Sequence, residues 1–367
     1  MQKTGFGCRI LVALLALALA SGRFAWSPGG FDLDLSTRAQ ASNNMADELS
    51  PQIDASIRRA LSWLAAEQRP SGAWRADEYG ESTAATSLAI LAFLAGGHVP
   101  DEGPYGDKIT KGIAWVLSQQ LDNGLLSGRD NSHGPMYSHG ITTLMLAEIA
   151  GMVNPDQVEA VNRSLERAIR LIIDAQNVPR PAQHDGGWRY QPADTDADLS
   201  VTAWQLLALR AARDIGCDVP VENIERAVAY VKRLRVPHGG GFGYMAGHGA
   251  TITRSGTGIV ALEVCGEHRT DETMAAANLI LSRPLTQQEH YFYYGVYYCT
   301  VGMYKIGGNE WKEARAQLYS TTLDLQNPAG YWNPTDGSER RAGKVYATSL
   351  CVLALAIEYG YLPIYQR

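Results

Sequence analysis

The chain has 367 residues, of which 46% are hydrophobic and 19% are charged, so its composition is that of a folded protein and not of a disordered one. The formal net charge is −6, and lysine and arginine do not cluster anywhere, which excludes a nucleic-acid partner because such binding depends on neutralising phosphates. Five cysteines, 37 glycines and 16 prolines exclude a collagen and a disulfide-rich scaffold.

The first 20 residues have the pattern of a signal peptide. Lys3 and Arg9 precede an unbroken apolar run over 10–20, which as a helix would rise about 16 Å and so fall short of a bilayer core of about 30 Å. Small residues at 18–20 offer a cleavage site, and Ala-Gln-Ala at 39–41 offers a later one. The sequence predicts an exported protein, periplasmic or extracellular. The alternative is an uncleaved signal anchor, which would then be its sole membrane contact.

The next segment, 21–48, is polar and has little periodicity, so we expect a disordered leader. The folded body is predicted to occupy 49–367. Its cysteines lie mostly in apolar helical patterns, which is typical of buried thiols, and their spacings match no zinc site. An aspartate run at 194–198 lacks the glycine and glutamate that an EF-hand loop needs. We therefore expect neither a metal nor a cofactor.

The body contains an internal repeat. Two copies of the motif Gln-x3-Gly-x-Trp are complete, and three others have lost a residue or gained an insertion. The complete copies are Gln68/Gly72/Trp74 and Gln326/Gly330/Trp332, and the altered ones are Gln120/Gly124/Leu126, Gln176/Gly186/Trp188 and Gly240/Phe242. Each copy follows one helical pattern and precedes another. The spacing leaves room for a pair without the motif, over 272–281 and 291–304.

The sequence therefore predicts six helix hairpins and almost no β-strand. The second helix of a pair is expected to begin near Thr86, Thr142, Thr202, Thr257 or Ser349. A single hairpin cannot bury its apolar face, so the hairpins must stack. Apolar faces on both helices favour a closed double ring over an open solenoid. The prediction is an all-α toroid of six hairpins in two concentric rings.

The motif has a structural interpretation. Its glutamine is placed to hydrogen-bond the free carbonyls at a helix C-terminus, its glycine allows a tight turn, and its tryptophan covers that turn. Trp74, Trp188 and Trp332 are accordingly expected to be buried between neighbouring hairpins, away from any cavity.

These repeats resemble the terpenoid cyclase and protein prenyltransferase superfamily, over about residues 50–367. Squalene–hopene cyclases in that superfamily carry several such repeats on a toroid of six inner and six outer helices. The chain is most similar to exported bacterial proteins described as prenyltransferase/squalene-oxidase repeat proteins. The resemblance implies the toroid fold and leaves the activity open, since one fold hosts many functions.

Class II terpene cyclases use an Asp-x-Asp-Asp motif before Thr-Ala, and its middle aspartate protonates an alkene. Aligning Thr-Ala at 202–203 places Asp198, Ser200 and Val201 on the three aspartates, and serine is far too weak an acid. Asp196 or Asp198 would have to act from a shifted position. A lone Asp198 at a helix N-terminus is expected to be ionised, because the helix dipole stabilises the carboxylate.

Two other toroid families fit less well. The final inner helix lacks the histidine of the prenyltransferase zinc site. In Cys265-Gly266-Glu267-His268 a histidine replaces the glutamine that thioester domains require, so these residues are better explained as a helix C-cap.

In a closed ring of hairpins the inner helices run in one direction, so their N-termini meet at one mouth. Their positive dipole ends favour anions or electron-rich groups. We expect Asp198 and Arg254 to pair across this rim. The candidate ligand-binding residues are His139, Trp204, Arg254, His290, Tyr291, Tyr294, Tyr297 and Tyr346. For the tyrosines, ordinary core packing is the alternative, and for the histidines an exposed loop.

Two function classes are open. The first is a binding toroid that holds an apolar or isoprenoid-like small molecule, or a protein partner. The second is a terpenoid cyclase-like isomerase with Asp196 or Asp198 as its acid. A carbohydrate lyase or hydrolase is a more distant third, because it needs paired carboxylates or a tyrosine, arginine and histidine set in a cleft.

Overall fold

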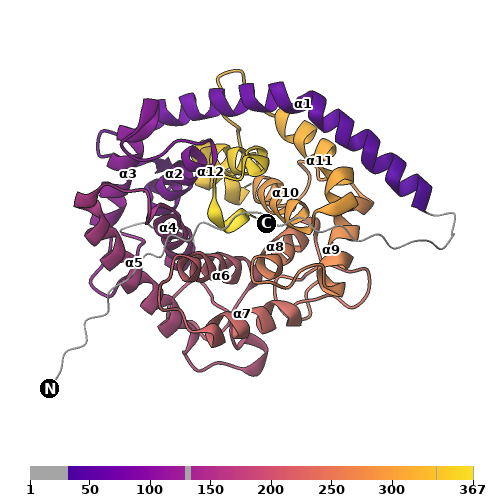
Figure 1. Ribbon diagram of the computed structural model, residues 1–367. Helices are drawn as coiled ribbons and strands as arrows, with labels where there is room; N and C mark the ends of the chain where they lie inside the picture. Colours follow the sequence, from indigo (N-terminus) through magenta and orange to yellow (C-terminus); the bar gives the residue numbers. More distant parts are fainter. Residues whose placement is uncertain (1–31, 129–133, 336, 367) are drawn as a thin grey trace, which may run out of the picture.

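The computed structural model describes residues 32–128, 134–335 and 337–366 (Figure 1). Its helices alternate between an outer and an inner ring. The outer helices are α1 (Asp32–Glu67), α3 (Gly106–Ser118), α5 (Pro155–Gln176), α7 (Val221–Arg233), α9 (Asp271–Ser282) and α11 (Gly308–Leu323). The inner helices are α2 (Thr83–Ala95), α4 (Pro135–Ile149), α6 (Leu199–Asp214), α8 (Ile252–Glu263), α10 (Phe292–Ile306) and α12 (Gly337–Leu355).

Short elements complete the description. Strands β1 (Arg75–Ala76) and β2 (Gly80–Glu81) form an antiparallel hairpin between α1 and α2. The described residues also form four 3-10 turns, η1 (Gly103–Tyr105), η2 (Ala182–His184), η3 (Ile357–Tyr359) and η4 (Pro363–Tyr365).

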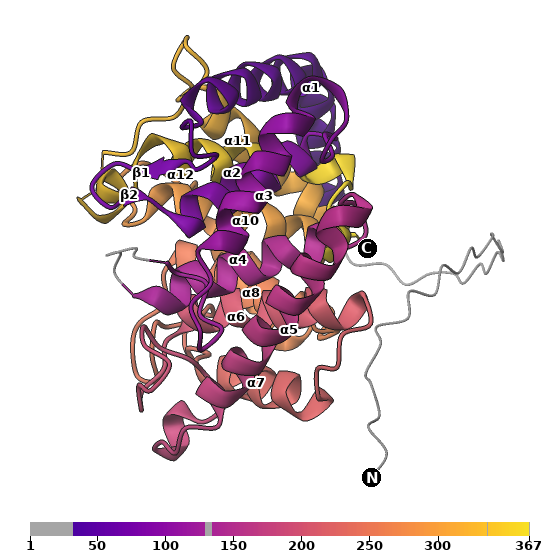
Figure 2. The ribbon, with the colours of Figure 1, turned by 90° about the vertical axis from the view of Figure 1, so that its left-hand side faces the viewer.

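Both rings are closed. Each inner helix packs against the next, and α12 returns to α2, while α11 packs along α1 in the outer ring (Figures 1 and 2). This confirms the predicted all-α toroid of six hairpins, including the fifth pair, which lacks the motif. Five inner helices in the described ranges begin three or more residues before the Thr or Ser that marked their predicted starts, whereas α10 begins one residue after its predicted start at 291.

The motif glutamine joins neighbouring hairpins. Gln176 donates to the carbonyl of Gly186 in its own turn at 2.8 Å and to the carbonyl of Asn223 in the next outer helix at 2.9 Å. Gln68, Gln120 and Gln326 make the equivalent pairs of bonds, to Gly72 and Lys108, to Gly124 and Ser164, and to Gly330 and Ser56. The expectation that this side chain caps its own helix was wrong, because the amide reaches across to the next one.

The motif glycine permits that approach. Gly186 has φ of +85°, and a Cβ built on it would lie 2.1 Å from the carbonyl oxygen of Arg226 in α7. The glycines at 72, 124, 240 and 330 also have positive φ, and each would place a Cβ within 2.8 Å of a carbonyl oxygen in the next outer helix. A side chain at these positions would push the hairpins apart.

The three motif tryptophans are buried, as predicted. Each indole N–H donates to a carbonyl at the end of its own outer helix, and each backbone N–H donates to a threonine of the following inner helix. A Cβ built on Gly112 of α3 would lie 3.0 Å from the Trp74 ring, so this ring also contacts the next hairpin.

The N-terminal part of the body differs from the prediction. Helix α1 begins at Asp32, so residues 32–48 of the expected leader are helical. Ala46 is fully buried and Asp47 pairs with Arg315 of α11 at 2.8 Å, so packing along α11 supplies the stability that the local pattern lacks. The predicted signal peptide lies outside the described residues. No helix in the described ranges is both long and apolar enough to cross a bilayer.

The C-terminal segment packs at the end of the ring where the inner helices have their C-termini. Ile364 and Tyr365 of η4 are buried, and the Tyr365 hydroxyl hydrogen-bonds that of Tyr297 in α10. Figure 1 shows the chain end at the centre of the toroid. The ring is therefore filled from the C-terminal ends of its inner helices.

We predict that Gly186→Ala destabilises the protein more than Gly216→Ala does. Both glycines have φ near +90°, so the backbone strain of alanine is shared, but a Cβ at 216 meets no atom within 4 Å. Forcing the α5–α6 turn away from α7 should cost about 1–3 kcal/mol beyond the control, measured as the free energy of unfolding in urea. Equal losses for the two variants would show that close approach of the hairpins is unimportant.

Candidate functional site

The inner-helix N-termini meet at one mouth of the toroid, opposite the C-terminal segment. Arg189, between α5 and α6, lies at the centre of a polar cluster there. Its Nη1 contacts the carboxylate of Asp198 at 2.7 Å and the hydroxyl of Tyr244 at 2.6 Å, and its Nε contacts Asp196 at 3.1 Å. Its guanidinium also lies 4.0 Å from the centroid of the Tyr190 ring. Two carboxylates of this chain therefore balance the charge of the arginine.

The predicted pairing of Asp198 with Arg254 was wrong. Arg254 donates to the carbonyl of Gly249 at 3.2 Å and lies 5.6 Å from the centroid of the Tyr244 ring. Arg189 takes its place as partner of Asp198. The sequence analysis missed Arg189 because it follows the motif tryptophan directly and belongs to no recognised pattern.

Asp198 is the N-cap of α6 and is fully buried. Burial raises the pKa of Asp198 above its usual value, while hydrogen bonds from the Val201 N–H and from Arg189 oppose that rise. The expectation from the helix dipole alone left out desolvation. Burial acts to lower the pKa of Arg189, but its hydrogen bond to Asp198, the charge of that carboxylate and the nearby tyrosines together outweigh burial, so the net shift is upward. The guanidinium therefore stays charged beside the carboxyl.

The three aspartates at 194–198 do not gather to share a proton. Asp194 accepts a hydrogen bond from the Gln191 N–H at 2.8 Å and is half-buried, whereas Asp196 and Asp198 both contact Arg189. A nearby guanidinium favours the ionised form of a carboxyl group. A carboxylate in that form carries no proton to donate to an alkene. The arrangement does not produce the strong acid that alkene protonation needs.

Ser200 stands where the cyclase motif has its acid, and it lies near the phenol of Tyr294. The Thr257 hydroxyl donates to the same phenol at 3.1 Å, and burial raises the pKa of Tyr294. Neither a serine nor a phenol with a raised pKa can protonate an alkene.

Tyr294, Tyr297 and Trp204 fill the middle of the ring. Trp204 of α6 stacks on Tyr297 of α10 with ring centroids 5.6 Å apart and an interplanar angle of 5°, and Tyr298 packs against its edge. Trp204 is 2% exposed and Tyr297 is fully buried. These predicted ligand-binding residues are brought together, but as packed core.

His139 is also a core residue and not a rim residue. Its Nδ1 accepts a hydrogen bond from the Leu126 N–H at 3.0 Å, and its Nε2 lies 3.1 Å from the Ala168 carbonyl. It therefore replaces the threonine that receives the tryptophan N–H in the other hairpins. Burial lowers the pKa of His139 to about 4, so the imidazole is neutral.

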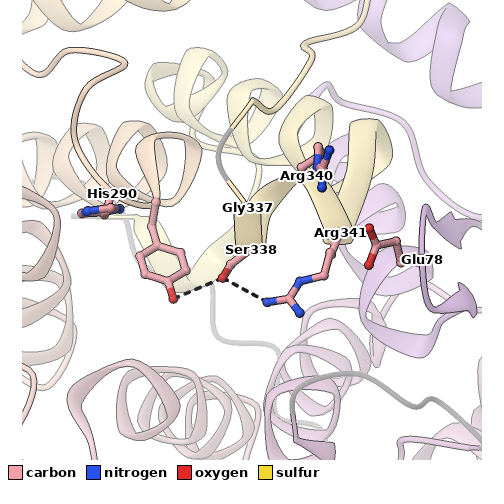
Figure 3. Close-up of a pocket in the computed structure, with 7 residues that line it drawn as sticks. Glu78, His290, Gly337, Ser338, Arg340 and Arg341 are labelled. Carbon is pink, nitrogen blue, oxygen red and sulfur yellow. Dashed lines mark hydrogen bonds between the residues drawn. The ribbon is translucent and has the colours of Figure 1, made fainter.

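A solvent-open pocket of about 520 Å³ lies at the mouth, between the start of α10, the start of α12 and the β1–β2 hairpin (Figure 3). Two predicted residues, His290 and Tyr291, line it. The other lining residues, which the sequence analysis missed because no motif marks them, are Glu78, Gly337, Ser338, Arg340 and Arg341. The hydroxyl of Tyr291 and the guanidinium of Arg341 both lie 3.5 Å from the Ser338 hydroxyl.

The wall of this pocket is fixed by a break in α12. Gly343 has φ of 91°, and the turn before it, 337–342, leaves the line of the inner helix. That turn directs Glu339 at α10, where the carboxylate accepts the N–H groups of Tyr293 at 3.1 Å and Tyr294 at 2.8 Å. Tyr346 hydrogen-bonds Glu339, and burial raises the pKa of Tyr346. Tyr346 thus supports the pocket wall without lining the pocket.

A second, smaller pocket of about 270 Å³ lies on the other side of the β1–β2 hairpin, and Arg69, Arg75, Asp77 and Lys344 are among its lining residues. No group of three histidine, cysteine or acidic residues placed to hold a metal occurs within 32–128, 134–335 and 337–366.

The family model of the prenyltransferase alpha-alpha toroid domain matches residues 8–135, 147–282 and 273–363. The chain therefore belongs to this family. No curated protein matches it.

Solved structures with the same fold differ widely in activity. An α-1,6-mannanase, GH76A of Salegentibacter sp. HEL1_6, is 12% identical with a TM-score of 0.60, over 83% of this chain and 99% of that one. A D-mannose isomerase is 10% identical with a TM-score of 0.61, over 84% and 98%. The type II terpene cyclase MstE from Scytonema is 14% identical with a TM-score of 0.50, over 89% and 99%. At these identities the likeness shows the fold alone.

We predict that His139 makes stability depend on pH. Its pKa is about 4 when folded against a usual 6.5, so its stabilising contribution is complete above pH 6.5 and is lost as the pH falls towards 4. Between pH 7 and pH 5 this amounts to about 2 kcal/mol. His139→Gln should lower the free energy of unfolding at pH 7. It should also remove the part of the pH dependence of that free energy that His139 contributes. The exposed His238→Gln is the control. If His139→Gln leaves the slope of the unfolding free energy unchanged, the assigned role is wrong.

We predict that Glu339→Gln destabilises the protein by about 1–2 kcal/mol, because the start of α10 loses a charged cap. The exposed Glu78→Gln, in the same pocket, should change the free energy of unfolding by less than about 0.5 kcal/mol. Similar values for the two variants in urea denaturation would argue against the cap.

Proposed function

We propose that this protein is an exported, non-catalytic binding toroid whose ligand enters the pocket at the N-terminal mouth of the inner ring. The observation that carries the proposal is the contrast between the two parts of the ring. The centre is filled by Trp204, Tyr297 and Tyr365, while the mouth keeps an open pocket of about 520 Å³. That volume falls within the range of about 300–1,000 Å³ common for small-molecule sites.

The composition of the pocket favours a polar small molecule. Two arginines, a histidine, a glutamate and a serine line it, with Tyr291 as its aromatic member. Such a surface suits hydroxyl, carboxylate or amide groups better than the apolar or isoprenoid-like ligand expected from the sequence, and better than a flat protein interface. Export rests on the signal-peptide pattern of residues 1–20.

The cyclase-like alternative has less support. A class II cyclase needs a strong acid facing an enclosed apolar chamber, whereas Asp196 and Asp198 face Arg189, and Ser200 faces a phenol. The glycosidase and isomerase structures that share the fold give no reason to prefer an enzyme, since they share only the fold.

We expect a polar metabolite to co-purify with the full chain and to be detected by native mass spectrometry after gentle isolation. Tyr291→Ala should abolish its retention without changing the melting temperature, because Tyr291 is 48% exposed and lines the pocket. Tyr361→Ala, at an exposed tyrosine outside the pocket lining, is the matched control and should retain the ligand.

A parallel incubation with squalene and shorter polyprenyl substrates should give no cyclised product. Product that disappears in both Asp196→Asn and Asp198→Asn would replace the binding proposal with the enzyme. Retention of the metabolite by Tyr291→Ala would show that the ligand binds elsewhere.

A further inference from the structure

We propose that the mouth pocket recognises a carboxylate of its ligand, with Arg341 as the cation that binds it. This inference rests on the proposed binding function and names the chemical group that the pocket selects. It follows from the charges around the pocket, from the groups already engaged and from the backbone of Tyr291.

The two pocket arginines form no ion pair within the ranges that the structure describes. Among the described residues, neither Arg340 nor Arg341 has a carboxylate within 4.0 Å, whereas Arg189, at the same mouth, contacts two. The hydrogen bond from Arg341 to Ser338 uses one of its five guanidinium donors. An arginine fork with donors to spare is the side chain best suited to a planar carboxylate.

The other positive feature of this region is already occupied. The Glu339 carboxylate accepts the N–H groups of Tyr293 and Tyr294 at the start of α10, so these two donors are not available to a ligand. The anion must therefore bind on the pocket side of the 337–342 turn. There Ser338 and Arg341 share one face, three residues apart, while Figure 3 shows the Arg340 guanidinium directed away from Ser338.

The part of the pocket next to Arg341 also discriminates among anions. Glu78 lies beyond Arg341 at the edge of the pocket, and its backbone N–H donates to the Arg341 carbonyl at 3.1 Å. Its negative charge opposes a second negative charge on the ligand. The pocket therefore favours a singly charged carboxylate over a doubly charged phosphate.

Tyr291 provides a surface for the body of the ligand. It adopts φ 58° and ψ 52°, a left-handed conformation that is unfavourable for a tyrosine, and it leaves the ring 48% exposed. Strain of this kind persists where the surrounding structure enforces it and is often found at binding sites. A flat ring beside a guanidinium suits a ligand with a planar or apolar face next to its carboxylate.

The test uses three probes that share a phenyl ring, namely benzoate, benzamide and phenyl phosphate. Their dissociation constants for the full chain are measured by saturation-transfer NMR titration. We expect benzoate to bind about tenfold more tightly than benzamide and more tightly than phenyl phosphate. Arg341→Gln should weaken benzoate about tenfold, and Arg340→Gln, with the same change of net charge one residue away, by less than about twofold.

Equal affinities for benzoate and benzamide would overturn the inference, as would tighter binding of phenyl phosphate or unchanged benzoate binding in Arg341→Gln. Melting temperatures of both variants, compared with that of the unsubstituted chain, show whether a loss of binding reflects unfolding. These outcomes are separate from the proposed function. If Tyr291→Ala loses a polar metabolite while benzoate fails to bind to the unsubstituted chain, the proposed binding function is supported. In that case only the inference that the ligand carries a carboxylate is rejected.

Discussion

The toroid depends on one amide group that serves two hairpins. The two N–H donors of a single glutamine side chain bond the carbonyl of its own turn and a carbonyl of the next outer helix, at 2.8–2.9 Å in all four copies. Because Gln326 makes the second bond to Ser56 of α1, the last hairpin is tied to the first and the outer ring closes. The motif glycine leaves room for this contact, and a buried amide with both donors satisfied resists opening of the ring.

Ring closure then fixes where polar chemistry can occur. The inner helices are buried on nearly all sides, so their polar side chains must find partners inside the protein. Asp198 and Arg189 satisfy each other, and Glu339 satisfies the start of α10. The chamber that a terpene cyclase would keep open is occupied by stacked aromatic rings and by the C-terminal Tyr365. The open space that remains is the pocket at the mouth, where Arg341 forms no ion pair within the described part of the chain.

The candidate ligand-binding residues lie in different parts of the ring, for physical reasons. His290 and Tyr291 line the mouth pocket, but His139 does not, because it takes the place of the inner-helix threonine that accepts a backbone N–H from the preceding turn. The signal was present, since Leu126 and His139 are 13 residues apart, close to the 12 that separate Trp74 and Thr86. Trp204 and Tyr297 belong to the right helices, yet whether aromatic side chains line a cavity or fill it depends on how far they reach across the ring.

The sequence by itself determined the number of hairpins, their order and the buried place of the motif tryptophans, because helical periodicity and turn chemistry are local properties that repeat along the chain. Tertiary structure alone decided that Arg189 and not Arg254 pairs with Asp198, that Glu339 caps a helix some 45 residues earlier, and that Arg341 lines the mouth pocket together with Glu78. Such pairings join segments that are distant in sequence. They are set by the closure of the ring and by the break at Gly343, where a change of a few backbone angles selects which side chain points at the mouth.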